Sequence, residues 1–409
     1  MDTSNKASSM KKKRILFVIN RLNSGGTERV LIPIVNRLVQ EDYDITVQVL
    51  CPGNIMRDTL DSRVHFVYKS LQELPGKRIP YIRYKLYDDE MWVKRCTQRQ
   101  YYRYYIGREK FDYEVAFFHE KPLKLVSGSN NPSAKRIAWV HIDFANEKGI
   151  TNAFRSKEDL IEAYRKTDHV VCVTEIAAKS FLKVIGEVPD LRVIRNFLPV
   201  GEIIEKAKEP ANTALPDAKL RLVCVGRLRD REKGQARLIE AVAALKAAGA
   251  DLSLTLVGGG NDEAAYRELI EKADAASYIT LTGRQENPYP YIKAADLLVC
   301  SSYAEGYNLT VAEALILGVP VLSTDCAGPR EILDNGRYGM ITENSREGLY
   351  NGIKKLYDDP TLLEEYRQKT AERQDYFDED EIFGQILDLF GGRRSAAADR
   401  HPDEGTNET

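Results

Sequence analysis

The chain has 409 residues, of which 43% are hydrophobic and 29% are charged, and its formal net charge is −2. This length exceeds what one hydrophobic core usually supports, so we expect two globular domains. The near-neutral charge gives no electrostatic basis for nucleic-acid binding, so we do not predict that function. The six cysteines are scattered without a CxxC pair, which predicts buried reduced thiols in a cytosol rather than disulfides or a zinc site.

The first predicted element is a buried strand over residues 15–19, followed by a loop that contains Gly25 and Gly26. The apolar run of this strand is too short for a signal peptide, and no run of about 18 apolar residues occurs to span a membrane. A glycine pair between a strand and a helix lets a ligand approach the backbone closely, and a simple flexible turn is the alternative. Thr27 is the expected N-cap of a helix that runs to about Gln40. The loop lacks G-x-G-x-x-G, which argues against a dinucleotide site.

Further strands of the first domain are predicted by short apolar runs that end in polar residues. They cover residues 45–50, 64–67, 113–118, 137–140, 170–173 and 192–194. Two of them are followed by histidines, His119 and His141. A histidine at the carboxyl end of a strand can contact a hydroxyl group or transfer a proton, whereas a lone histidine is more often structural. For His119 we prefer the structural role, and for His141 both interpretations stay open at this point.

Basic and aromatic side chains interleave from residue 77 to residue 110. Such a stretch suits an anionic membrane surface, where tyrosine rings lie at headgroup depth and cations contact lipid phosphates. A nucleic-acid surface is a second interpretation, and a solvated helical face with tyrosines packed beneath it is a third.

The domain boundary is predicted within residues 202–218, which are rich in Lys, Glu, Ala and Pro and lack a strand pattern. On both sides of this segment, strands alternate with helices, which predicts two α/β domains with parallel sheets. We divide the chain into a first domain over residues 11–200, a linker over 201–218, a second domain over 219–372, a C-terminal helical segment over 373–392 and a polar, disordered tail over 393–409.

In the second domain, a strand over residues 220–225 ends next to Arg227, and Lys233 precedes the following helix. Two cations between the carboxyl end of a strand and a helix N-terminus suit a diphosphate group. A solvated charged loop is the alternative. Arg284 follows a later strand over residues 278–281, at a position that can flank the base of a nucleotide.

The strongest functional pattern begins at a buried strand over residues 297–300. This strand leads into a polar turn with Glu305, and a helix over residues 308–317 carries Glu313. The N-terminus of that helix offers backbone N–H groups to a phosphate, and the two carboxylates can bind hydroxyl groups. In the purely structural interpretation, Thr310 and Glu313 form a capping box and Glu305 is merely solvated.

This pattern resembles the paired-glutamate signature of the retaining, nucleotide-sugar-dependent glycosyltransferases of family four. The matching residues are EGYNLTVAEA at 305–314, GVPVLSTD at 318–325 and GPRE at 328–331. The resemblance covers most of the chain and is strongest over residues 220–331. It implies the GT-B architecture, in which two Rossmann-like α/β domains face each other across a cleft and the last helix crosses back to the first domain.

The resemblance also implies roles for individual residues. Glu305 would contact the donor sugar and Glu313 the ribose of the donor. Arg227 and Lys233 would hold its pyrophosphate, although their spacing is one residue longer here than we expect for the family. His141 would reach the donor sugar from the first domain. Further donor-binding positions are Gly25, Gly26, Asn308, Leu309, Thr310, Arg284 and Asn196.

We therefore predict an enzyme that moves a sugar from a nucleotide diphosphate donor, a UDP-sugar, to a hydroxyl group of a glycan or lipid-linked acceptor. No cofactor is expected, and no metal, since no Asp-x-Asp at a strand end and no histidine cluster is found. The expected location is the cytoplasm, with peripheral contact to the inner membrane face through residues 77–110.

Other functions remain open from the sequence. A nucleotide-sugar epimerase of the same fold is the closest alternative. A glycoside hydrolase would use Glu305 and Glu313 as its acid and nucleophile. A nicotinamide oxidoreductase and a non-catalytic nucleotide-sugar binding or membrane-recruitment module are the remaining candidates.

Overall fold

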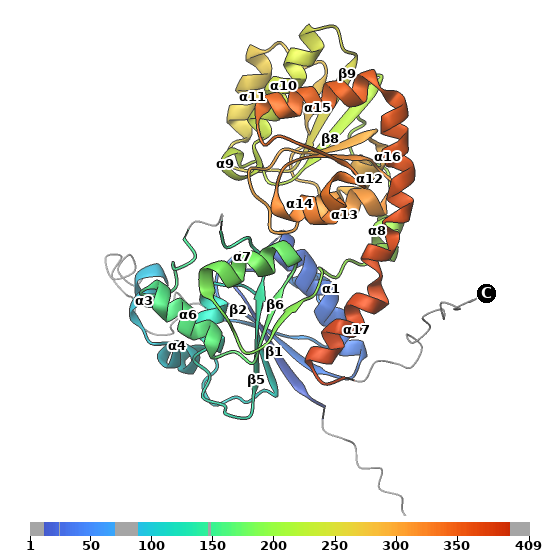
Figure 1. The fold of residues 1–409 in the computed structure, drawn as a ribbon. Helices are drawn as coiled ribbons and strands as arrows, with labels where there is room; N and C mark the ends of the chain where they lie inside the picture. Colours follow the sequence, from blue (N-terminus) through green and yellow to red (C-terminus); the bar gives the residue numbers. More distant parts are fainter. Residues whose placement is uncertain (1–11, 24, 70–88, 146–148, 393–409) are drawn as a thin grey trace, which may run out of the picture.

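The computed structural model describes residues 12–23, 25–69, 89–145 and 149–392. They form two domains, each built on a parallel β-sheet that is flanked by helices (Figure 1). This arrangement confirms the predicted α/β class with two Rossmann-like domains.

The first sheet has the strand order β3-β2-β1-β4-β5-β6-β7, and all of its neighbouring pairs are parallel. Its strands are β1 (Arg14–Ile19), β2 (Asp44–Val49), β3 (His65–Tyr68), β4 (Tyr113–Ala116), β5 (Lys135–Val140), β6 (His169–Cys172) and β7 (Leu191–Val193). The helices of this domain are α1 (Gly26–Gln40), α3 (Asp89–Arg95), α4 (Gln98–Tyr105), α5 (Lys121–Val126), α6 (Lys157–Arg165) and α7 (Glu175–Ile185).

The second sheet has the order β10-β9-β8-β11-β12-β13 and is also parallel throughout. Its strands are β8 (Leu220–Val225), β9 (Leu252–Val257), β10 (Ile279–Leu281), β11 (Leu297–Cys300), β12 (Val321–Thr324) and β13 (Met340–Thr342). The helices that follow β7 are α8 (Val200–Lys206), α9 (Asp230–Lys233), α10 (Gln235–Ala247), α11 (Glu263–Lys272), α12 (Tyr289–Ala294), α13 (Leu309–Ile316), α14 (Ala327–Ile332), α15 (Arg346–Asp358), α16 (Pro360–Glu372) and α17 (Glu379–Leu389).

The continuous apolar runs of the strands follow from burial of both faces of each sheet. In β1, Ile15 and Phe17 belong to one hydrophobic cluster, whereas Leu16 and Val18 belong to another on the opposite face. The first of these clusters also includes residues of the second domain, such as Leu309. The two domains are therefore joined by shared apolar packing as well as by the chain.

Both sheets reverse their strand order at one point. The chain runs outward from β1 to β3 and returns at β4, and in the second sheet it runs outward from β8 to β10 and returns at β11. The loops that follow the two strands at such a reversal diverge, which opens a crevice at their carboxyl ends. The two switch points therefore predict where a ligand would bind in each domain.

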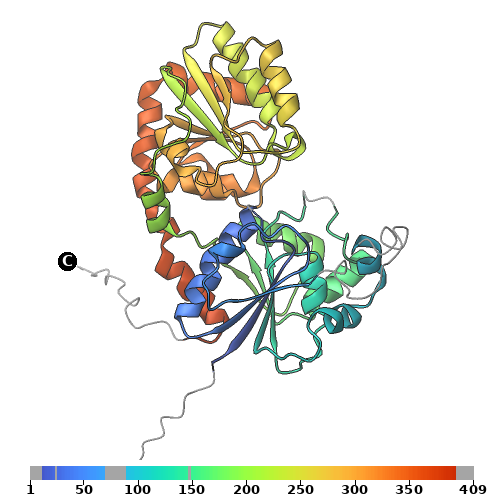
Figure 2. The ribbon, with the colours of Figure 1, turned by 180° about the vertical axis from the view of Figure 1, so that it is seen from behind.

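The C-terminal helix α17 returns to the first domain, as the resemblance implied, and lies beside α1 in both views (Figures 1 and 2). Phe390 packs edge-on against Phe17 and Tyr113, with ring centroids 6.1 and 5.2 Å away. Arg37 of α1 donates to Asp380 of α17 at 2.5 Å. This segment thus ties the end of the second domain to the core of the first.

Most predicted elements differ from the structure by no more than two residues at either end, but the predicted cap of α1 is wrong. The helix begins at Gly26, its N-cap is Gly25, and no side chain caps it. Thr27 therefore already lies inside the helix. The helix therefore starts within the glycine pair, earlier than the prediction of Thr27 as its N-cap implied.

The basic and aromatic stretch is described only in its second half, because residues 70–88 lie outside the described residues. In that half, Tyr101, Tyr102 and Tyr105 of α4 are buried, and the Tyr102 hydroxyl donates to Glu114 Oε1 at 2.8 Å. These three rings pack beneath the helix, as the third interpretation of the stretch expects. The tail over residues 393–409 also lies outside the described residues.

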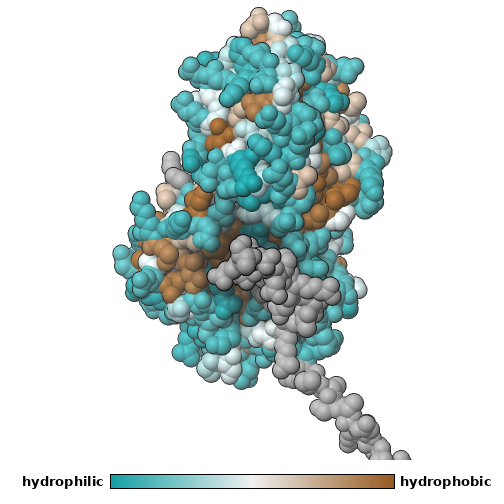
Figure 3. Space-filling view, turned by 45° about the vertical axis from the view of Figure 1, so that its right-hand side comes forward, coloured by the Kyte–Doolittle hydropathy of each residue, from teal (hydrophilic) through white to brown (hydrophobic). Residues whose placement is uncertain are grey.

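The face of the molecule in Figure 3 is mostly hydrophilic, with hydrophobic residues in small groups. All six cysteines fall within the described residues, where they are buried and form no disulfide, in agreement with the predicted buried thiols. None of the described helices combines the length and the apolar character that a bilayer crossing requires.

Candidate active site

The predicted cation and carboxylate of the second domain meet at its switch point. Strands β8 and β11 are neighbours, so the loops that follow them begin side by side although they lie far apart in sequence. Lys233 Nζ donates to Glu305 Oε1 at 2.6 Å, and Ser302 Oγ donates to the same oxygen at 2.5 Å. The side chains of Lys233 and Glu305 are 26% and 13% exposed, so the pair is reachable from solvent only on one side.

The Glu305 carboxylate keeps Lys233 charged. Burial alone would lower the pKa of Lys233, but the attraction and the hydrogen bond of Glu305 outweigh it, and the pKa is raised. The ammonium group also retains two further N–H donors, because only one is needed for Glu305. Lys233 is therefore a fixed positive charge with free hydrogen-bonding capacity.

Arg227 belongs to a cluster of three arginines around one acid. Glu232 lies 3.9 Å from Arg227, 2.9 Å from Arg229 and 3.7 Å from Arg231. Arg227 is 63% exposed, and its charge acts on Lys233. Since a single carboxylate faces three guanidinium groups, this loop carries an excess of positive charge beside the Lys233–Glu305 pair.

Close backbone contacts fix the loops around these charges. A Cβ on Gly258, whose φ is +149°, would lie 1.9 Å from the carbonyl oxygen of Gly226, and one on Gly260 would lie 2.2 Å from that of Leu228. Side chains are therefore excluded where the loop after β9 presses against the loop after β8. Arg284, at the end of β10, lies beside this loop, with its Cβ 3.4 Å from a Cβ built on Gly259, and is exposed.

The start of α13 is formed by three predicted donor-binding residues. Asn308 is the N-cap, and its Oδ1 accepts from Val311 N at 3.1 Å and from the Thr310 hydroxyl at 2.8 Å. The side chains of Asn308 and Thr310 thus form hydrogen bonds within the N-terminal turn of the helix. The backbone N–H groups of Leu309 and Thr310 have no acceptor within the helix and are what this turn can offer to an anion.

The capping-box interpretation of Glu313 is wrong, because Asn308 rather than Thr310 caps the helix. Glu313 is instead almost fully buried and pairs with Arg29 of the first domain. Arg29 Nη2 donates to Glu313 Oε1 at 2.5 Å and to the Tyr289 hydroxyl at 2.7 Å. Burial raises the pKa of Glu313, and Arg29 offsets part of that rise.

The glycine loop of the first domain meets this part of the second domain. A Cβ on Gly26 would lie 3.5 Å from the Leu309 side chain, and one on Gly25 would lie 2.4 Å from Glu28 Oε2. Burial raises the pKa of Glu28, while hydrogen bonds from backbone N–H groups and the charge of Arg227 lower it in part. Glu28 therefore folds back over the start of α1 and lies within electrostatic reach of Arg227.

His141 follows β5 and approaches the Glu305 loop through the backbone. A Cβ on Gly306 would lie 2.4 Å from the His141 carbonyl oxygen. The imidazole packs against Phe117 and Trp139, and its Nε2 is buried without a hydrogen-bond partner in the described structure. Burial and the neighbouring His119 lower the pKa of His141 to about 3, so the ring is neutral at physiological pH.

His119 and Asn196 lie deeper. His119 is buried, and burial lowers its pKa to about 3, which fits the structural role that we prefer for it. Asn196 follows β7 and is 5% exposed, with its Oδ1 unpaired in the described structure. Within the described residues, neither side chain hydrogen-bonds to the Lys233–Glu305 pair.

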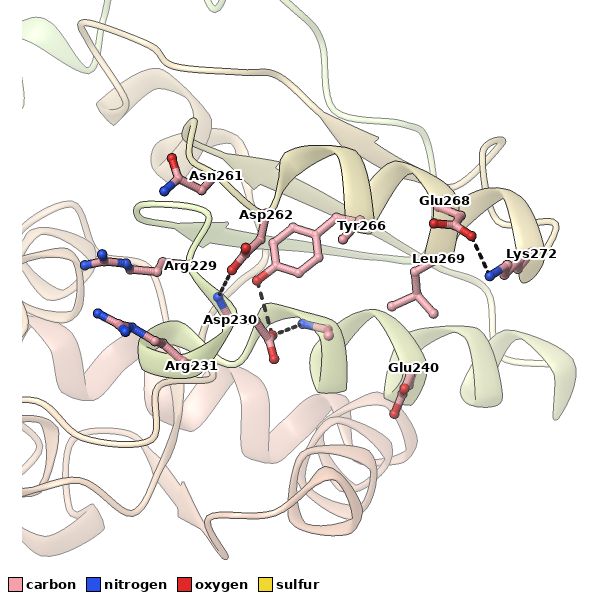
Figure 4. A pocket seen from close by; sticks show the side chains of 12 residues that line it. Arg229, Asp230, Arg231, Glu240, Asn261, Asp262, Tyr266, Glu268, Leu269 and Lys272 are labelled. Atoms are coloured by element: carbon pink, nitrogen blue, oxygen red, sulfur yellow. Dashed lines mark hydrogen bonds and ion pairs between the residues drawn. The ribbon is translucent and has the colours of Figure 1, made fainter.

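A groove of about 770 Å³ lies behind the Arg227–Lys233 loop, between the start of α10 and α11 (Figure 4). In it, the Tyr266 hydroxyl donates to Gln235 Oε1 at 2.9 Å, and Gln235 Nε2 donates to the Arg227 carbonyl oxygen at 2.9 Å. These contacts brace the loop from its outer side.

The sequence interpretation missed Arg29, Glu28, Tyr289 and Ser302 as residues of this site. Glu28 and Arg29 follow the glycine pair within three residues, so their position next to this loop could have identified them as site candidates. The contact between Arg29 and Glu313 spans 284 positions and depends on how the domains face each other, which no local pattern reveals.

Known proteins resemble this chain in sequence mainly over its second domain. Residues 205–374 match the family model of glycosyl transferases group 1. Over 192 residues the chain is 30% identical to the Campylobacter jejuni N-acetylgalactosamine-N,N'-diacetylbacillosaminyl-diphospho-undecaprenol 4-alpha-N-acetylgalactosaminyltransferase, covering 46% of this chain and 50% of that protein. It is 29% identical to the lipopolysaccharide core biosynthesis glycosyltransferase LpsE of Rhizobium meliloti over 51% of this chain and 58% of LpsE. The chain spans about half the length of these curated relatives.

Solved structures extend the likeness to both domains. Anabaena HepE in complex with UDP and glucose superposes with a TM-score of 0.70 at 18% identity, covering 93% of this chain and 99% of HepE. The sucrose-phosphate synthase of Thermosynechococcus elongatus gives a TM-score of 0.70 at 17% identity, over 93% and 98% of the two chains. The chain therefore has the GT-B fold of glycosyltransferases. Its residues 205–374 match the group 1 glycosyltransferases, in agreement with the resemblance found in the sequence.

Proposed function

We propose that this protein is a retaining glycosyltransferase that transfers a sugar from a UDP-sugar to a hydroxyl group of a glycan or lipid-linked acceptor. The observation that carries the proposal is the Lys233–Glu305 pair at 2.6 Å, near Arg227 and at the switch point of the second sheet. A cation next to a carboxylate matches the two parts of such a donor, because the diphosphate needs positive partners and the sugar hydroxyls need acceptors.

The charge that develops in the reaction determines the role of each cation. When the bond between the anomeric carbon and the diphosphate oxygen breaks, negative charge grows on the leaving diphosphate. Lys233 and Arg227 would stabilise that charge together with the N–H groups at the start of α13. Glu305 would accept a hydrogen bond from a hydroxyl of the sugar. In this proposal no metal ion is needed, since the protein supplies the positive charge.

His141 would complete the sugar site from the first domain. A neutral imidazole with an unpaired Nε2 can exchange a hydrogen bond with a sugar hydroxyl, but it holds no proton to donate as an imidazolium at neutral pH. The contact between the His141 and Gly306 backbones would keep the two halves of the site together and limit the access of water to the donor.

The names of similar proteins support the choice of substrates. HepE was solved with UDP and with UDP-glucose, which favours a UDP-sugar as donor. The C. jejuni relative is named for a diphospho-undecaprenol acceptor and LpsE for lipopolysaccharide core biosynthesis. We therefore propose a lipid-linked or cell-surface glycan precursor as acceptor, met by the protein at the cytoplasmic face of a membrane.

The proposal is tested first by ligand-induced stabilisation. Wild type and Glu313→Ala are heated with UDP, GDP, ADP or NAD, with and without magnesium, because a ligand that binds the folded state raises Tm. We expect UDP to raise the Tm of wild type regardless of magnesium and to lose this effect in the variant. A shift with NAD alone would favour the oxidoreductase.

A transfer assay then tests the chemistry. With a UDP-sugar and a polyprenyl-diphosphate-linked sugar as acceptor, we expect glycosylated lipid and UDP from wild type and strongly reduced turnover from Glu305→Gln. Release of a free epimerised UDP-sugar would favour the epimerase. Release of sugar from an oligosaccharide without any nucleotide would contradict the transferase and favour the hydrolase.

A further inference from the structure

Arg29 connects the two domains at one end of the candidate site. It extends from the first turn of α1, and its Nη2 donates to Glu313 Oε1 at 2.5 Å and to the Tyr289 hydroxyl at 2.7 Å. Both acceptors belong to the second domain, on α13 and α12. The Arg29 side chain is 24% exposed, whereas that of Glu313 is 1% exposed. The partly exposed guanidinium group of Arg29 therefore contacts a carboxylate that solvent hardly reaches.

Glu313 has one carboxylate oxygen engaged and one without a partner. Its Oε2 is buried and accepts no hydrogen bond within the described structure. A buried carboxylate oxygen without a donor is unfavourable, so such an atom indicates a ligand that donates a hydrogen bond to it. Arg29 opposes the effect of burial on the pKa of Glu313 and thus favours the ionised, strongly accepting form.

The order of groups along the site identifies the ligand group. Glu305 precedes α13, the free N–H groups of Leu309 and Thr310 are at its start, and Glu313 is one turn further along. In a nucleotide-sugar donor the sugar, the diphosphate and the ribose follow one another in the same order. With the sugar at Glu305 and the diphosphate at the helix start, the ribose reaches Glu313.

We propose that Arg29 is a positioning residue that holds Glu313 so that its free Oε2 accepts a ribose hydroxyl, and that recognition of the ribose therefore requires both domains. This inference rests on the proposed function, since only a nucleotide donor brings a ribose to this place. The Tyr289 hydroxyl accepts a hydrogen bond from the same Nη2 and anchors the guanidinium group. The residue acts through Glu313 and needs no contact with the reacting atoms.

The test compares UDP with 2′,3′-dideoxy-UDP by titration calorimetry in wild type and Arg29→Gln. Wild type should prefer UDP by about tenfold or more, because a hydrogen bond to a charged group is at stake. In Arg29→Gln this preference should fall to within about twofold, since only UDP loses affinity. If the thermal panel selects GDP or ADP, the same pair of nucleotides with that base is used.

Matched variants separate this role from a general loss of structure. Arg29→Lys keeps a positive charge but lacks the planar guanidinium group, and it should retain part of the preference for UDP over the dideoxy nucleotide. Tyr289→Phe removes one anchor and should weaken the preference less than Arg29→Gln. Arg37→Gln is the same substitution two turns along α1, where it breaks the pair with Asp380, and should leave the preference intact. Thermal unfolding of each variant shows whether it is folded.

Three results would overturn the inference while leaving the proposed function in place. Wild type could bind both nucleotides equally, Arg29→Gln could weaken both equally, or Arg29→Gln could bind UDP more tightly, which would make Arg29 a competitor of the ribose. If wild type binds none of the nucleoside diphosphates, the proposed function fails first and the role of Arg29 with it.

Discussion

The carboxyl ends of the two sheets carry opposite kinds of side chain. At the switch point of the second sheet, Lys233 and Glu305 form an ion pair beside three arginines that share Glu232. At the carboxyl ends of β4 and β5 in the first sheet, His119 and His141 are neutral and packed among aromatic rings. One rim therefore offers fixed charge and the other offers hydrogen bonds in an apolar setting.

This difference shows how two similar sheets can divide one task. A diphosphate is bound by charges that are already in place and need no rearrangement when the leaving group becomes more negative. A sugar ring has hydroxyl groups and apolar C–H faces, which suit neutral imidazoles beside aromatic rings. The proposed donor would thus receive its electrostatic stabilisation from the second domain and its neutral contacts from the first.

Removal of the central cation should have the largest effect. Lys233→Ala leaves Glu305 with only the Ser302 hydroxyl among the contacts described here and deletes a positive charge next to the leaving diphosphate. We expect the transfer rate to fall by about 10² to 10³-fold, in line with the loss of one preorganised charge contact. Lys246→Ala, which removes an outer lysine that pairs with Asp251, is the matched control and should keep full activity. A loss of less than tenfold in Lys233→Ala would contradict the assigned role.

Separation of the two rims should have the next largest effect. In Gly306→Ala the new Cβ would lie 2.4 Å from the His141 carbonyl oxygen and 2.8 Å from Ile142 Cα, so the backbones must move apart. We expect about a 10²-fold loss of transfer, because displacements near 1 Å at a reacting centre have costs of this size. Gly384→Ala in α17 meets no atom within 4 Å and should be active and at least as stable. Equal activity of both variants would show that the contact does not matter.

The sequence predicted the charged rim far better than the neutral one. Arg227, Lys233 and Glu305 lie in loops that follow strands of one parallel sheet, and the family resemblance implied that they act on the same donor. The same reasoning found His141 but not the burial that makes it neutral, because burial depends on packing against Phe117 and Trp139. Arg29 was missed because its partners are on the other domain. The local sequence pattern therefore predicts which side chains follow a strand, whereas the packing of the domains determines which partners those side chains contact.

The neutral rim should make the fold sensitive to acid. The folded-state pKa of His119 and of His141 is about 3, below the ordinary 6.5, so the unfolded state binds more protons between these values. Stability must therefore fall as the pH drops below 6.5, by about 2 kcal/mol for each histidine between pH 7.5 and pH 5. Urea unfolding of wild type and His119→Gln at both pH values measures this, and the variant should lose about half of the pH-dependent change. An identical pH dependence in both proteins would mean that His119 is not buried as a neutral ring.

The smallest effect is expected at the edge of the charged rim. Glu232 is the carboxylate that Arg227, Arg229 and Arg231 all approach, so Glu232→Gln should leave the three guanidinium groups less neutralised. Because these side chains are largely exposed, solvent and salt screen the change, and we expect UDP to bind only about two- to threefold more tightly. The gain should shrink between 50 and 300 mM salt, and Glu240→Gln, the same change at an acidic residue on the following helix α10, serves as the control. Weaker UDP binding in Glu232→Gln would show that Glu232 orients the arginines more than it neutralises them. In that case Lys233, rather than Arg227, would be the main positive charge that binds the diphosphate.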